Sequence, residues 1–328
     1  MARASKSVRV VPFACPFGEG SIVYAYYLDT PEPALIDTGV ARSPSGAIAP
    51  ALRAAGLRLD EVRWILATHG HWDHIGGAHA ARSLAHASAR LAIHDADAGL
   101  LADRQQHMRT YWGERFRYLD DADSLERAEA VLFANISGEV AADRKLTDGD
   151  RVWLGRGIHL DVVHTPGHTP GSVTYVLRQA GSAFTGDAVQ VGGSSGSSRF
   201  PLYTDPTAYR ASIIRLLADV QATRLFLGHR FLDPAGAALP AQLEGDRAHA
   251  ALLASIEVEH RIASAVQQRK LVPPAFGAVS ALTSAAEALG FGTNPATWPP
   301  ALFVTLGAYV RMLPQGDAPQ EARDVREP

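Results

Sequence analysis

The sequence predicts an α/β fold whose short apolar strands end in acidic or histidine side chains. This pattern occurs at Asp37, in the segment 69–74, at Asp187 and at His229. Segments compatible with helices separate the strands, as is typical of α/β proteins. Because side chains at strand ends meet at one rim of a sheet core, we expect these residues to lie close together.

The first half of the chain alternates apolar runs with short helical segments. In the run 21–28, Tyr24 and Tyr26 alternate with Ala25 and Tyr27, as expected of a strand. The predicted strands are 8–11, 21–28, 34–39, 62–67 and 90–93, and the predicted helices are 45–56 and 76–87.

The next segment, 95–139, is charged and mostly helical and carries large apolar side chains at helical spacing. Farther along, the runs 173–177 and 182–185 predict a hairpin. A loop rich in Gly and Ser then opens at 192 and runs to 205. The remaining predicted strands are 152–154, 158–163 and 224–227, and the remaining predicted helices are 206–219, 241–268, 278–288 and 300–313.

The length of 328 residues exceeds that of a usual single domain. We therefore predict one large domain over residues 1–238, with a helical insertion at about 95–140. A helical appendage is predicted over 239–313, and a flexible tail rich in Pro and charged residues over 314–328.

The composition bears on partners and compartment. A net charge of −3 without a Lys or Arg block argues against nucleic acid, and no run reaches the roughly 20 apolar residues of a membrane helix. Cys15 is the only cysteine, so no intrachain disulfide can form. The apolar stretch 10–15 is too short for a good signal peptide. We expect a cytoplasmic protein that acts on a small molecule, with the aromatic insertion or the Ala-rich C-terminal helices as candidate surfaces for a homodimer.

The segment 68–77 places three histidines and one aspartate within six residues, His69, His71, Asp73 and His74, between an apolar strand and a helix. Imidazole and carboxylate are the ligands that borderline divalent cations prefer. On an extended backbone His69 and His71 face one ion, whereas Asp73 and His74 point to the side as the helix begins. Two adjacent ions fit this pattern better than one.

The later strand ends add His168, Asp187 and His229, and Asp37 lies upstream. In this order the set resembles the metallo-β-lactamase fold superfamily, with its strand-end Asp, H-x-H-x-D-H, later His, bridging Asp and final His. The resemblance covers residues 8–230 and implies an αββα sandwich of two mixed sheets between outer helices. It implies that the first metal is bound by His69, His71 and His168, the second by Asp73, His74 and His229, and both by Asp187. Asp37 is then expected to orient a ligand, and His164 to support one or to be structural.

Membership of this kind implies two divalent ions, most simply Zn²⁺, with Fe or Mn as alternatives. The expected reaction is hydrolysis, in which a hydroxide shared by two cations attacks a carbonyl carbon, with Asp73 as a further proton acceptor. The true β-lactamases of the superfamily typically lack an Asp equivalent to Asp187. We therefore expect a carboxylic ester, thioester or lactone substrate, as in the glyoxalase II, lactonase and thioesterase branches.

Other classes of function stay open at this point. Some proteins of this fold keep the metal site but act as non-hydrolytic effectors through protein contacts. A β-lactamase, a phosphodiesterase and a diiron redox protein are further alternatives; the last is disfavoured because no flavin-binding module supplies an electron route.

Substrate contacts are expected from the helical insertion, from the loop after residue 192 and from the C-terminal helices. For each side chain an ordinary role, packing or a surface ion pair, is at least as plausible. The candidates are Tyr111, Trp112, Phe116, Arg199, Tyr203 and Tyr209.

Overall fold

A computed structural model describes residues 8–18, 20–112, 122–194, 200–268 and 280–312. Its first sheet has six strands in the order β1-β2-β3-β4-β5-β6. The first three strands pair antiparallel, and β3 to β6 pair in parallel. The strands are β1 (Arg9–Phe17), β2 (Ser21–Asp29), β3 (Ala34–Ile36), β4 (Trp64–Leu66), β5 (Arg90–His94) and β6 (Arg144–Leu146).

The second sheet also has six strands, in the order β12-β11-β10-β9-β8-β7. Only β10 and β11 pair in parallel, so this sheet is mixed as well. The strands are β7 (Arg151–Trp153), β8 (His159–His164), β9 (Val173–Leu177), β10 (Ser182–Gly186), β11 (Arg224–Leu227) and β12 (Gln242–Glu244).

The two sheets face each other across an apolar core. Alternation along β2 sends Tyr24 and Tyr26 into this core, whereas Ala25 and Tyr27 pack under the outer helices. Two buried hydroxyl groups tie the sheets together. Tyr26 Oη donates to Leu227 O at 2.5 Å, and Tyr175 Oη donates to Ala67 O at 2.8 Å.

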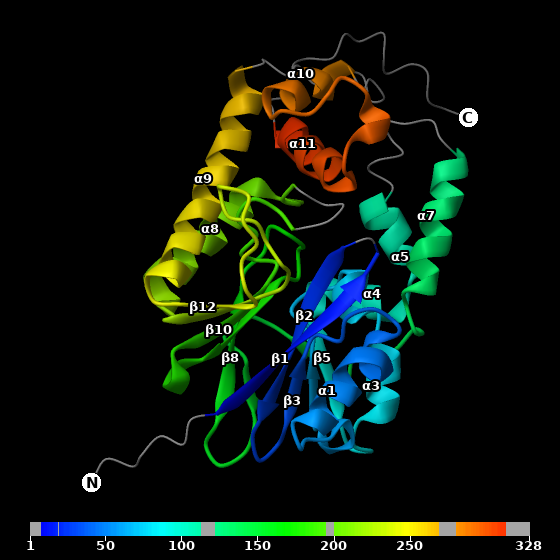
Figure 1. Cartoon of the computed structure of the whole chain (residues 1–328), viewed down its shortest axis with the longest axis vertical. Helices are drawn as coiled ribbons and strands as arrows, with labels where there is room; N and C mark the ends of the chain where they lie inside the picture. The colour runs from blue at the N-terminus through cyan, green and yellow to red at the C-terminus, as the bar shows by residue number, and fades with distance from the viewer. Residues whose placement is uncertain (1–7, 19, 113–121, 195–199, 269–279, 313–328) are drawn as a thin grey trace.

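Helices cover both outer faces, which gives the expected αββα sandwich (Figure 1). One face carries α1 (Ala49–Ala54), α3 (Ala78–Leu84) and α4 (Ala98–Ala102). The other face carries α8 (Pro206–Arg215), α9 (Asp246–Gln268), α10 (Ser280–Ala288) and α11 (Pro300–Met312). The short helices α2 (Trp72–Ile75) and α5 (Gln105–His107) and the longer α7 (Ala122–Ala134) complete the described elements of this type.

Several elements differ from those predicted, and two of the differences affect the sheets: β1 is longer than the predicted strand 8–11, and β12 lies in the segment 241–268 that was predicted as a helix. Strand β1 runs through Pro12 and Pro16 to Phe17, because it is an edge strand whose proline nitrogens need no partner. Strand β12 lies beyond the predicted domain boundary at 238, yet it pairs with β11 and completes the second sheet.

The C-terminal helices share one hydrophobic core with the second sheet. Glu259 of α9 is 2% exposed, and its carboxylate accepts hydrogen bonds from Arg210 of α8 and Tyr309 of α11, both at 2.6 Å. The predicted appendage is therefore packed into the main body of the fold. The predicted tail, 314–328, lies outside the described residues.

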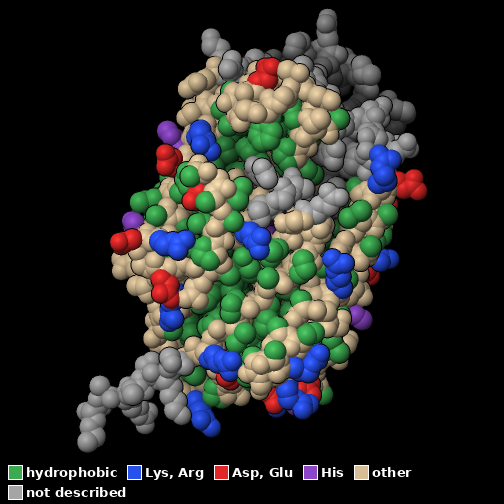
Figure 2. All heavy atoms as spheres, in the orientation of Figure 1, with side chains coloured by type: hydrophobic (Ala, Val, Ile, Leu, Met, Phe, Trp, Pro, Cys, Tyr) green, Lys and Arg blue, Asp and Glu red, His purple; other side chains and the backbone are tan. Residues whose placement is uncertain are grey.

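Within the described residues, no helix combines the length and the apolar character that a membrane span requires. Basic and acidic side chains are interspersed on the face shown in Figure 2.

Candidate metal centre

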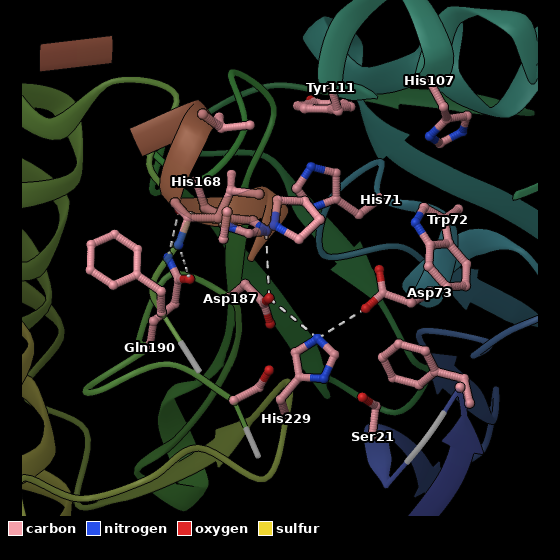
Figure 3. Close-up of a pocket in the computed structure, with 18 of the residues that line it drawn as sticks. Ser21, His71, Trp72, Asp73, His107, Tyr111, His168, Asp187, Gln190 and His229 are labelled. Atoms are coloured by element: carbon pink, nitrogen blue, oxygen red, sulfur yellow. Dashed lines mark hydrogen bonds and ion pairs between the residues drawn. The ribbon is translucent and has the colours of Figure 1, made fainter. Parts of the chain in front are cut away.

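Seven side chains converge at the rim of the sandwich, from loops and helix starts that follow four strands. His69 and His71 follow β4, and Asp73 and His74 lie in α2. His168, Asp187 and His229 follow β8, β10 and β11. Three sets have ligand atoms within 4.8 Å of one another: His69 with His71 and His168, His69 with His74 and Asp187, and Asp73 with His74 and His229. Figure 3 shows five of these residues around one cavity.

Four of the histidines are oriented by a hydrogen bond at Nδ1. His168 Nδ1 donates to Leu202 O at 2.9 Å, and His229 Nδ1 donates to Ile22 O at 2.9 Å. The Nδ1 atom of His74 lies 2.8 Å from Asp37 Oδ2, and that of His69 lies 3.1 Å from Thr68 Oγ1. In a neutral ring whose proton lies on Nδ1 in these contacts, Nε2 presents a lone pair to the interior.

The inward atoms have the character of metal ligands. The Nε2 atoms of His69, His71 and His168 and Oδ1 of Asp187 are buried without a hydrogen-bond partner in the described structure. Nε2 of His74 lies only 3.0 Å from Nε2 of His229. Two lone pairs at this distance repel unless a cation or a proton lies between them. The donor set of imidazole nitrogens and carboxylate oxygens therefore fits divalent ions such as zinc.

The pKa values in the cluster divide the histidines into two groups. Burial, with help from neighbouring imidazoles, lowers the pKa of His69 and His71 well below its usual value. Burial also disfavours the charged form of His229, but Asp187 and Asp73 outweigh it and raise the pKa of His229 to about 10. Likewise Asp187 and Asp37 overcome burial and raise the pKa of His74.

The two carboxylates in the cluster stay ionised. Burial opposes the charge of Asp187, but His229 and His74 hold its pKa well below the usual range. Burial also opposes the charge of Asp73, but His229 and His74 outweigh burial and lower the pKa of Asp73. Asp187 Oδ2 lies 3.5 Å from His168 Nε2 and 3.3 Å from His229 Nε2, and Oδ1 lies 3.4 Å from His74 Nε2. Its position between the two groups of histidines suits a shared ligand.

Asp37 supports the cluster from behind. Its Oδ2 contacts His74 and accepts the Thr68 hydroxyl at 2.8 Å, while Oδ1 accepts the Thr68 backbone N–H at 2.8 Å. One carboxylate thus orients His74 directly and His69 through Thr68. Asp37 has a φ of 58°, a left-handed conformation that costs a residue with a Cβ some free energy and is typical of functional sites.

Asp97 was not among the predicted site residues. It is 1% exposed and joins the two loops that carry histidines. Oδ2 accepts Gly70 N–H at 2.7 Å and the Thr169 hydroxyl at 2.6 Å, and Oδ1 accepts Gly171 N–H at 2.8 Å. Burial raises its pKa although three donors surround it. A Cβ at Gly171 would lie 2.4 Å from Asp97 Cγ, so this close approach requires glycine. The available signal was position, because Asp97 follows β5 as the other acids follow their strands.

His164 plays a structural part. Its Nε2 donates to Pro170 O at 2.8 Å, and its ring stacks on His94 with the ring centres 4.2 Å apart. This contact holds the loop that carries His168. No hydrogen bond between His164 and a member of the metal cluster is found among the described residues.

Gln190 also acts on this loop. Its Nε2 donates to Leu202 O at 2.9 Å, and its Oε1 accepts Leu202 N–H at 2.9 Å. Leu202 O is the same atom that accepts the His168 imidazole. Gln190 therefore holds the carbonyl that orients a candidate ligand, and no sequence pattern singled it out.

A cavity of about 340 Å³ opens above the cluster, within the usual size range of small-molecule sites. The insertion, the loop after residue 192 and α11 all contribute to its wall, as predicted for the segments. Among its described lining residues are Phe17, Trp72, Tyr111, Phe200, Phe231 and Val304.

The structure places the predicted substrate contacts in different surroundings. Tyr111 lines the cavity and packs edge-on against the His71 ring at 4.3 Å. Tyr203 and Tyr209 are fully buried in the core beneath the C-terminal helices and are not cavity residues, so their assignment as substrate contacts is wrong. They pack against each other because apolar helices cover the segment that carries them. Phe116, Arg199 and the side chain of Trp112 lie outside what the structure describes.

Comparison with known proteins places this geometry in context. The model of the metallo-beta-lactamase superfamily matches residues 18–229. A hydroxyacylglutathione hydrolase of Anaeromyxobacter dehalogenans is 33% identical over 230 residues, which are 69% of this chain and 68% of that protein. A probable metallo-hydrolase of Burkholderia pseudomallei is 31% identical over 188 residues, 54% of this chain and 55% of that protein.

Human mitochondrial persulfide dioxygenase ETHE1 is 30% identical over 176 residues, 53% of this chain and 50% of that protein. The chain thus spans about half the length of several curated relatives that it matches. Among solved structures, a metallo-beta-lactamase family protein of Thermus thermophilus aligns with a TM-score of 0.66 at 21% identity. That alignment covers 92% of this chain and 93% of the other, and it shows the fold.

Proposed function

The chain belongs to the metallo-beta-lactamase superfamily, and from this premise we propose that it is a two-metal hydrolase acting on a carboxylic ester, thioester or lactone. The observation that carries the proposal is the set of buried Nε2 and Oδ1 atoms without partners below the cavity. In this proposal His69, His71 and His168 bind one ion, Asp73, His74 and His229 bind the other, and Asp187 contacts both.

When bound, two divalent ions supply Lewis acidity toward a carbonyl oxygen and a water that ionises near neutral pH. The side chains of the protein do the rest. Asp73 is anionic at neutral pH, and its side chain is 15% exposed, against 7% for Asp187. Its carboxylate is therefore the more accessible of the two, and in this proposal it accepts a hydrogen bond from an attacking water and receives the proton. Trp72 and Tyr111 place aromatic surface in the cavity wall beside these groups, and a less polar surrounding strengthens their electrostatic interactions.

The choice of a carbonyl substrate rests on a relative. The hydroxyacylglutathione hydrolase that is 33% identical acts, by its name, on an acylated thiol. This favours a thioester among the three carbonyl classes.

A second candidate is an oxygenase that acts on a sulfur compound, favoured by the 30% identity to persulfide dioxygenase over half of the chain. The same imidazole and carboxylate ligands can bind iron. Oxygen uptake by iron-loaded protein with a persulfide, measured beside the zinc-loaded protein, separates this function from hydrolysis.

The hydrolase proposal is tested by initial rates of zinc-loaded protein on a panel of acyl thioesters, lactones, aryl esters, a β-lactam and a phosphodiester. We expect one carbonyl class to react and the wild-type protein to hold two zinc ions per chain. The Asp73→Ala variant should hold fewer ions and lose at least about 100-fold in rate, as expected when a group that transfers a proton is removed.

Asp95→Ala is the matched control, because Asp95 is an exposed carboxylate paired with Lys145. It should keep the wild-type rate and metal content. A fully metal-loaded protein that hydrolyses none of the panel would count against the proposal, as would an Asp73→Ala variant with the wild-type rate.

A further inference from the structure

The cavity wall above the metal cluster is mostly hydrocarbon. Apart from the candidate ligands, the described lining has the polar side chains of Ser21, His107, Gln190 and Ser194 and the polar atoms of the Trp72 and Tyr111 rings, and it has neither Lys nor Arg. Gln190 is engaged with Leu202 on both of its amide atoms, and His107 Nε2 donates to Leu100 O at 3.0 Å. A charged substrate group buried against this described part of the wall would lack an ionic partner there, which opposes its binding.

A second hollow lies behind one part of this wall. It has a volume of about 450 Å³, and its mixed lining includes the apolar side chains of Val258, Ile262, Leu289 and Phe291 beside Arg261. Phe200 belongs to the lining of both hollows. Its ring is 8% exposed and packs edge-on against the Phe291 ring at 5.4 Å.

The segment at Phe200 is held in place by its surroundings. A Cβ at Gly193 would lie 2.5 Å from the Phe200 nitrogen, so the two backbones are in close contact. On the next residues, Thr305 of α11 accepts Tyr203 N–H at 2.8 Å and donates to Pro201 O at 2.9 Å. Phe200 is thus a fixed partition between the two hollows.

Building on the hydrolase function proposed above, we propose that the acyl group of the substrate is an uncharged hydrocarbon chain that lies along this wall, and that Phe200 sets its maximum length. The carbonyl carbon then sits at the metal cluster, where the polar lining is concentrated. The leaving group, which departs as an anion, faces the solvent side. The metal chemistry by itself does not require this choice of acyl group, because any acyl group can present a carbonyl.

The first test measures kcat/KM on straight-chain acyl thioesters that share one leaving group and differ by two carbons. Each buried methylene should raise kcat/KM about 4-fold, which corresponds to about 0.8 kcal/mol, until the chain reaches Phe200 and the value stops rising. The short hydroxylated acyl group of S-lactoylglutathione should be hydrolysed at least about 10-fold less efficiently than the best chain.

Phe200→Ala should join the two hollows and move the optimum to longer chains, with at least a 10-fold gain for the first chain that the wild-type protein rejects. Phe291→Ala makes the same side-chain change in the second hollow only. It should leave the wild-type length profile in place. An unchanged profile in Phe200→Ala, or an equal shift in both variants, would overturn the assignment of Phe200.

Binding separates this proposal from the hydrolase function itself. Straight-chain alkyl amides keep the carbonyl and the chain but resist hydrolysis, and calorimetry gives their Kd with metal-loaded protein. Affinity that rises about 4-fold per methylene supports the apolar acyl site even if no thioester is hydrolysed, in which case only the proposed reaction fails. Thioester hydrolysis without any dependence of rate or Kd on chain length overturns the acyl site and leaves the hydrolase function standing.

Discussion

Replacing Asp97 by asparagine should weaken metal binding although Asp97 is not a ligand. Its carboxylate joins the loop of His69 and His71 to the loop of His168 through three hydrogen bonds of 2.6–2.8 Å. Asparagine keeps the shape but has one acceptor oxygen. Placed at the Oδ2 position, this oxygen still accepts Gly70 N–H and the Thr169 hydroxyl, while the new NH₂ group faces Gly171 N–H.

The size of the effect follows from these contacts. A hydrogen bond to a charged group contributes about 1.5–3 kcal/mol. The variant loses one such bond and weakens two others, and it places its NH₂ donor against the N–H donor of Gly171. Together these changes cost roughly 3–4 kcal/mol on that scale. Burial raises the pKa of Asp97, so removing the buried charge offsets part of this cost. We expect a net loss of about 2 kcal/mol, equivalent to roughly 30-fold.

The assay is zinc affinity by competition with a chromophoric chelator, run beside thermal unfolding of the metal-free and metal-loaded forms. Asp97→Asn should bind zinc roughly 30-fold more weakly, within the range seen when outer partners of ligands are removed. Asp95→Asn, two residues away and exposed, should bind zinc like the wild-type protein. If Asp97→Asn unfolds earlier but binds zinc with wild-type affinity, the carboxylate stabilises the fold without positioning the ligands, and the reasoning is refuted.

Two further changes test other parts of the site. Burial lowers the pKa of His107 to about 4, so the neutral ring stabilises the fold above the unfolded pKa of about 6.5, and this stability is lost as the pH falls through 4. Between pH 7 and pH 4 the unfolding free energy of the wild-type protein should therefore fall by up to about 3 kcal/mol more than that of His107→Gln. An equal fall in both proteins, measured by denaturant unfolding at the two pH values, would contradict this. Gln190→Leu removes both bonds to Leu202 and should weaken zinc binding about 10-fold; unchanged affinity in the chelator assay would show that Leu202 O orients His168 without help.

The sequence was most informative where chemistry and chain position coincide. The spacing of His69, His71, Asp73 and His74 identified a metal site, because ligands this close in the chain need only one loop to converge. Strand ends then pointed to the later histidines and acids. Alternation in the run 21–28 predicted a strand. In the structure, the two faces of β2 are buried against two different apolar layers.

Features that depend on packing between distant segments were beyond local patterns. Tyr203 and Tyr209 were predicted as substrate contacts, but helices that follow much later in the chain bury them. Asp97 has the same strand-end signal as the ligands, yet its role depends on amide groups 27 and 74 residues away. Gln190 binds a backbone oxygen, and every residue has one, so the residue types in the sequence do not indicate this contact.

The C-terminal helices contact the segment that carries the candidate site as well as the core of the second sheet. Thr305 of α11 bonds the backbone on both sides of Leu202, and Leu202 O orients His168. The same helix contributes Val304 to the cavity wall. One helix therefore sets both a hydrogen bond that orients a ligand and the surface that a substrate meets. We expect a displacement of α11 to change metal binding and substrate fit together, because its register against residues 200–205 affects both parts of the candidate site.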